Sequence, residues 1–116
     1  STDLTLPGRE LTVHSMTEMM TRFLAMDFTF DQVVTMSTEN PAKAAGVADR
    51  LGTLHPGKQA DITVLDIQEG SWVLYDVVGG SRKSDKAVIP VMAVKKGEVF
   101  EAGWGPRPWG WAPDQA

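Results

Sequence analysis

Apolar residues recur with a helical period in the first part of the chain. Between residues 16 and 24 they fall at i, i+3, i+4, i+7 and i+8: Met16, Met19, Met20, Phe23 and Leu24. This spacing places them on one face of a helix, so we expect a helix from about Met16 to Met26. Four polar residues fall on its opposite face: Thr17, Glu18, Thr21 and Arg22.

Capping signals mark where the predicted helices start. Ser15 and Thr29 are each followed three residues later by Glu18 and Gln32, which is the pattern of a capping box. The second box begins a helix from about Phe30 to Ser37. A third, short helix is expected with Asn40 as N-cap, Pro41 at its first position and Gly46 at its end.

From Ile62 onward the apolar period changes to two, which predicts strands. We expect strands over residues 62–66, 72–78, 87–94 and 98–101, with a break at Gly79-Gly80-Ser81. Pro90 indicates an edge position or a bulge, because proline cannot donate to a sheet ladder. Lys96-Gly97 is a turn that joins the last two strands into a hairpin.

Composition limits the class of protein. The 116 residues suffice for one small domain with a core, and a net charge of −4 argues against nucleic acid or an anionic membrane as partner. There is no cysteine, no apolar run long enough to cross a bilayer, and no signal-peptide pattern at the start. These features favour a cytoplasmic protein.

The chain offers few metal ligands of its own. Its two histidines, His14 and His55, lie far apart, and no H-x-H or H-E-x-x-H motif is present. A catalytic zinc site normally takes three protein ligands. We therefore expect no cofactor in this chain by itself, and a structural or solvent-exposed role for His55 beside the Pro56-Gly57 turn.

Three motifs carry a resemblance to a known family. Residues 52–66 match the pattern G-x-L-x-P-G-K-x-A-D-h-x-V-h-D, where h is apolar, residues 40–46 match N-P-A-x-x-x-G, and Ser1-Thr2-Asp3 matches S-[ST]-D. In this order they resemble the C-terminal region of metal-dependent amidohydrolases. Within that superfamily the chain is most similar to the dihydroorotase-like amidohydrolase/deacetylase group.

The resemblance implies an α+β fragment of a larger fold. Residues 1–50 would be the remnant of the last strand and helix of a (β/α)8 barrel, with a short strand and three helices. Residues 51–101 would be antiparallel strands of the family's composite β-sandwich, and residues 102–116 form a Trp/Pro/Gly-rich tail. A whole barrel needs about 250 residues, so most of it would lie outside this sequence.

The resemblance also implies the site residues. Asp3 corresponds to the carboxylate that contacts the metal, with zinc expected, and that takes a proton from metal-bound water and passes it to the leaving group. Arg9 is a candidate for binding a substrate carboxylate, and His14 for lining the pocket. The residues by themselves leave three alternatives open: a solvated Asp3, a surface Arg9 and a half-buried loop His14.

Three functions follow as hypotheses. The first is the C-terminal part of a hydrolase of amide C–N or ester bonds in a small-molecule substrate, inactive as this chain alone. The second is a non-catalytic binding or oligomerisation module that reuses the fold, and the third is an active enzyme with a metal site shared across subunits. Three tryptophans within the eight residues 104–111, together with unpaired strand edges, predict a homo-oligomer; packing of the tail on the chain's own strands is the alternative.

Overall fold

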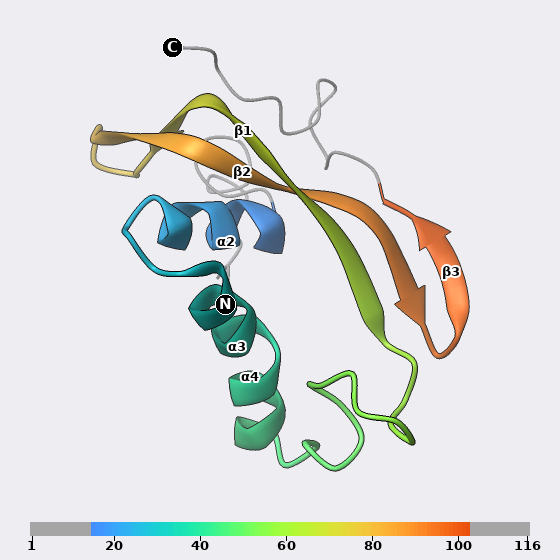
Figure 1. The fold of residues 1–116 in the computed structure, drawn as a ribbon. Coiled ribbons are helices and arrows are strands. Elements are labelled where there is room, and N and C mark those ends of the chain that lie inside the picture. Colours follow the sequence, from blue (N-terminus) through green and yellow to red (C-terminus); the bar gives the residue numbers. More distant parts are fainter. Residues whose placement is uncertain (1–14, 103–116) are drawn as a thin grey trace.

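The computed structural model describes residues 15–102. Three helices precede three strands, in the order α2 (Met16–Leu24), α3 (Phe30–Ser37), α4 (Glu39–Ala44), β1 (Ile62–Tyr75), β2 (Ser81–Lys95) and β3 (Glu98–Glu101) (Figure 1). The strands form an antiparallel sheet in the order β1-β2-β3. This confirms the predicted change from helices to antiparallel strands.

Side-chain caps start the first two helices as predicted. The Ser15 hydroxyl accepts a hydrogen bond from the Glu18 amide at 3.2 Å. Around α3 the capping box is complete, because Thr29 Oγ1 accepts from the Gln32 amide at 3.2 Å and Gln32 Oε1 accepts from the Thr29 amide at 2.9 Å. Helix α2 ends at Leu24, two residues before the predicted Met26.

The predicted start of the third helix was wrong by two residues. Helix α4 begins at Glu39, so Asn40 lies inside it and Thr38 takes the N-cap position. Pro41 then occupies the third helical position, where its missing N–H costs little because the first amides of a helix have no intrahelical acceptor. Gly46 ends the helix as predicted, with a φ of 70°.

The predicted strands 62–66 and 72–78 are one strand, which ends at Tyr75, and β2 begins at Ser81, six residues before the predicted strand 87–94. β1 runs through Gly70-Ser71, where the pairing with β2 shifts by one residue between Glu69 and Trp72. A second shift leaves Val91 unpaired next to Pro90, which confirms the predicted bulge. The β2–β3 turn is the predicted Lys96-Gly97, and both residues have positive φ, as a two-residue hairpin turn of type I′ requires.

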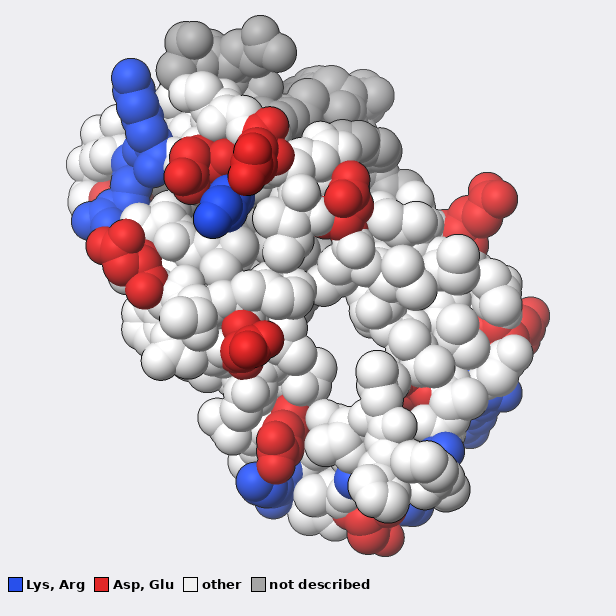
Figure 2. All heavy atoms as spheres, viewed as in Figure 1, with Lys and Arg blue, Asp and Glu red and all other residues white. Residues whose placement is uncertain are grey.

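The core consists of two buried clusters. One contains Trp72, Leu74, Ala87 and Ile89, with Ala25 at the end of α2 packed against it. The other contains Met20, Val33 and Val88, with partly buried apolar residues such as Leu65 around it. Helix α2 thus joins the helices to the sheet, whereas α3 and α4 extend away from the sheet (Figure 1). Figure 2 shows an opening between these two helices and the end of the sheet that bears β3.

A buried hydrogen bond attaches α2 to β2. Thr21 is completely buried, and its hydroxyl accepts from the Val88 amide at 2.9 Å while donating to the Thr17 carbonyl at 2.9 Å. The Val88 amide therefore points away from β1, and the helix lies along that side of β2. This contact is why Thr21, on the polar face of the predicted helix, is buried; Glu18 on the same face is buried as well.

Between residues 15 and 102 no helix has the length and apolar character that crossing a membrane requires.

Candidate functional site

The three residues predicted to form the site fall outside the described residues. Asp3, Arg9 and His14 precede residue 15, and the tail 103–116 follows residue 102. Their predicted roles therefore stay predictions, and the site can be approached only from the segments that would support it.

Within residues 15–102 no group of three or more His, Cys, Asp or Glu side chains could hold a metal ion. A catalytic zinc needs three protein ligands, so this part of the chain does not fit the metal that the resemblance implies. His55 is exposed, and its Nδ1 lies 3.1 Å from the Pro56 carbonyl oxygen.

Within the pattern of residues 52–66, residues 52–61 form a loop that packs against α4 before the chain enters β1. Gly52 has a φ of 94°, and a Cβ at this position would lie 2.6 Å from the Ala42 Cβ and 3.1 Å from the Thr38 carbonyl oxygen. Only glycine allows both the backbone conformation and this close approach to the helix. Lys58 holds the loop to the segment that follows α4, because its Nζ donates a hydrogen bond to the Ala48 carbonyl at 2.5 Å.

Asp61 joins this loop to the β2–β3 turn. Its Oδ2 accepts hydrogen bonds from Lys95 Nζ at 2.6 Å and Gln59 Nε2 at 2.8 Å, and its Oδ1 accepts from the Lys96 amide at 2.9 Å. The Gly97 amide adds a bond to the Ala60 carbonyl at 3.0 Å. We call these contacts the Asp61 clamp.

The clamp changes the acidity of Asp61. The Lys95 hydrogen bond, followed by those from the Lys96 amide and Gln59, lowers the pKa of Asp61 to about 2. The Lys96 contact satisfies the amide of the first residue of the β2–β3 turn. The sequence suggested neither Lys95 nor Lys96 as a partner of Asp61, because they lie 34 and 35 positions away from it.

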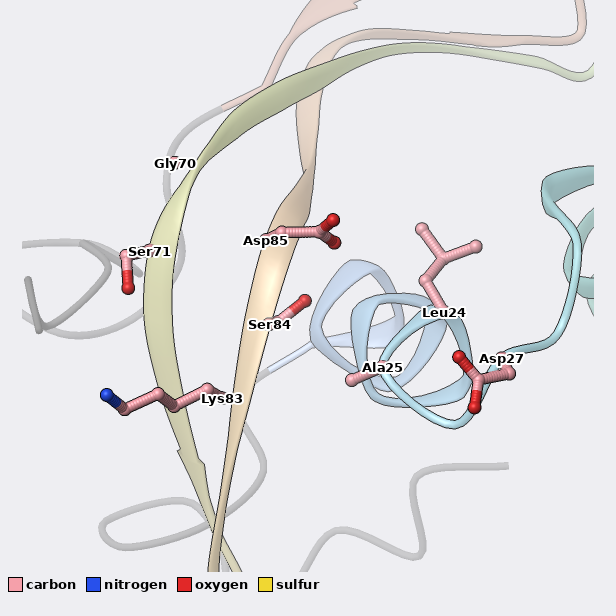
Figure 3. A pocket seen from close by; sticks show the side chains of 8 residues that line it. All are labelled: Leu24, Ala25, Asp27, Gly70, Ser71, Lys83, Ser84 and Asp85. Carbon is pink, nitrogen blue, oxygen red and sulfur yellow. The ribbon is translucent and has the colours of Figure 1, made fainter.

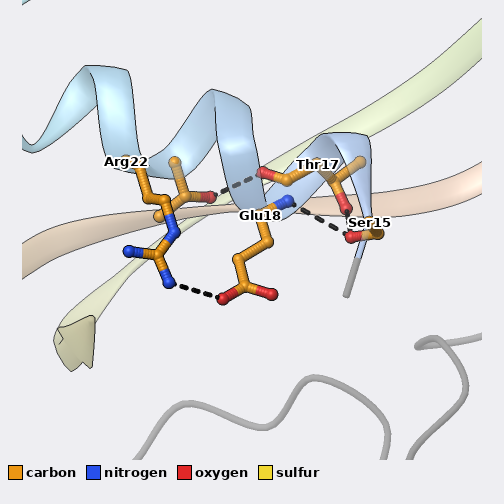
Figure 4. Close-up of polar contacts among 5 residues, drawn as sticks. Ser15, Thr17, Glu18 and Arg22 are labelled. Atoms are coloured by element: carbon orange, nitrogen blue, oxygen red, sulfur yellow. Dashed lines mark hydrogen bonds and ion pairs between the residues drawn. The ribbon is translucent and has the colours of Figure 1, made fainter. Parts of the chain in front are cut away.

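A charged pair that joins the first turn of α2 to its last turn lies partly inside the protein. Arg22 Nη2 donates to Glu18 Oε1 at 3.0 Å, and the Glu18 side chain is only 4% exposed (Figure 4). Ser15 Oγ lies 2.9 Å from Thr17 Oγ1 at the N-terminal end of the helix. Glu18 is four residues beyond His14, the last of the predicted site residues.

A surface hollow of about 360 Å³ lies where α2 ends beside the Gly70-Ser71 shift of β1. Its lining comprises Leu24, Ala25, Asp27, Gly70, Ser71, Lys83, Ser84 and Asp85. In Figure 3 the Asp85 side chain points from β2 toward the side where Leu24 and Asp27 lie, whereas Lys83 points to the opposite side. The sequence did not predict this hollow, because residues 70 and 71 were expected to separate two strands.

Comparison with known proteins gives the following matches. The model of the amidohydrolase family matches residues 1–99. A deacetylase of Enterococcus faecalis (strain ATCC 700802 / V583) is 26% identical over 102 residues, which cover 87% of this chain and 27% of the deacetylase.

Two crystal structures share the fold. One is of an adenine deaminase, with a TM-score of 0.83 and 25% identity over 88% of this chain and 28% of that chain. The other is of a dihydroorotase, with a TM-score of 0.80 and 29% identity over 89% of this chain and 27% of that chain. The chain therefore spans little more than a quarter of the length of each of these proteins.

Proposed function

The chain belongs to the amidohydrolase family, and from this premise we propose that it is the C-terminal part of a metal-dependent hydrolase that cleaves amide C–N or ester bonds in a small molecule. The observation that carries the proposal is the family match over residues 1–99, which includes all three motifs. The fold likeness to a deaminase and a dihydroorotase supports it.

The contribution of this chain to the metal site is one carboxylate. Asp3 stands in the motif that the family uses for a metal-contacting aspartate, whereas residues 15–102 contain no metal-binding group. We assign the remaining ligands of a zinc site to the three quarters of the family fold that this chain does not span. Arg9 and His14 are the proposed substrate-binding residues.

The described residues then serve as a scaffold. The Thr21–Val88 bond attaches α2 to the sheet, and the Asp61 clamp joins the loop after α4 to the β2–β3 turn. Helix α2 follows the segment with Asp3, so these contacts would hold that segment in a constant position. The strands would form part of the composite β-sandwich, completed by strands from elsewhere in the fold.

The test is a chimera in which residues 1–102 replace the corresponding C-terminal part of the Enterococcus faecalis deacetylase. We expect metal-dependent hydrolysis of N-acetyl substrates, and we expect the Asp3→Asn variant to lower kcat by about 10²–10⁴-fold, the usual contribution of a general base. Asp31→Asn, a substitution of an exposed carboxylate on α3, is the matched control and should leave the rate unchanged.

Two results would contradict the proposal. A folded, active chimera that retains its rate after Asp3→Asn would remove Asp3 from the catalytic site. A chimera that folds and binds metal without hydrolysing any acylated substrate would argue for the second candidate function.

That second candidate is an assembly module, and the length of β1 favours it. β1 has 14 residues, and in the described sheet only β2 pairs with it, so its other edge can accept a strand. We propose that two copies pair there if no other strand does. Light scattering at micromolar concentration should then show a dimer, and a clean monomer would rule it out.

A further inference from the structure

We draw no further inference here: the strongest candidate, the surface hollow where α2 ends beside the Gly70-Ser71 shift of β1, brings the carboxylates of Asp27 and Asp85 to one place, and nothing among the described residues points to a ligand for it.

Discussion

At the scale of single residues, the loop that precedes β1 depends on Gly52. Its positive φ disfavours any side chain, and its neighbours on α4 leave no room for a Cβ. Gly57 has nearly the same φ, 92°, but no atom within 4 Å of the Cβ position. The two glycines therefore separate the cost of backbone strain from the cost of a steric clash.

We predict that Gly57→Ala lowers the free energy of unfolding by about 1–2 kcal/mol through backbone strain. Gly52→Ala should lower it by a further ~1–3 kcal/mol, because Ala42 and the backbone of α4 must move. Urea denaturation of both variants measures the difference. Equal losses would mean that the loop does not pack on α4 as described.

Asp61 makes the second prediction at this scale, and its sign follows from the direction of the pKa shift. The pKa falls from 3.8 to about 2 on folding, chiefly through Lys95. A carboxyl group with a lower pKa in the folded protein contributes stability that is fully present above its unfolded pKa and is lost as the pH falls through the folded value. The loss should therefore occur between about pH 4 and about pH 2.

The Asp61→Asn variant should lose less stability than the wild type when the pH falls from about 5 to about 2.5 in urea titrations. Lys95→Met, which removes the first partner and keeps an apolar stem, should reduce the pH dependence in the same direction. If the wild type and both variants show the same pH dependence, the Asp61 clamp does not form in solution.

At the scale of elements, the contact between α2 and β2 rests on the Thr21 hydroxyl. Thr21→Val keeps the shape but leaves the buried Val88 amide without an acceptor, which costs about 1–3 kcal/mol. Thr21→Ser keeps the hydroxyl and loses one methyl, worth about 0.8 kcal/mol. We expect Thr21→Val to be the less stable of the two in urea and to exchange its Val88 amide faster; a more stable Thr21→Val would contradict this role.

Local patterns predicted most elements, because caps, turns and apolar periods act over a few residues. The Thr29–Gln32 box, the Gly46 helix end and the Lys96-Gly97 turn are of this kind. Features that depend on contacts between residues far apart in the sequence were not predicted. Thr21 is buried because its hydroxyl accepts a hydrogen bond from the Val88 amide, 67 residues away. β1 continues through Gly70-Ser71 because β2 pairs with it on both sides of the register shift.

The candidate site was predicted by family resemblance rather than by local physics. Asp3, Arg9 and His14 stand outside the described residues, so the structure gives them no geometry. Residue patterns did correctly indicate a turn followed by a strand within residues 52–66. This segment is held in place by the close approach of Gly52 to α4 and by the Asp61 clamp. Both depend on contacts that no short stretch of sequence contains.

At the scale of the whole molecule, one explanation accounts for three features that the described residues leave incomplete. Helices α3 and α4 extend away from the sheet, β1 has an unpaired edge in the described sheet, and residues 15–102 provide no metal-binding group. A chain that spans little more than a quarter of its relatives would lack the partners for these surfaces. This supports the proposal that the catalytic machinery is completed by other parts of the family fold.

The most direct test of this account is zinc-dependent hydrolysis of N-acetyl amino acids and p-nitrophenyl acetate by the purified 116-residue chain, compared with its Asp3→Asn variant. We predict that added zinc gives neither protein a rate above that of buffer, because one carboxylate cannot form a catalytic metal site. Zinc-dependent turnover by the chain that disappears in Asp3→Asn would contradict the account and support a metal site shared between copies.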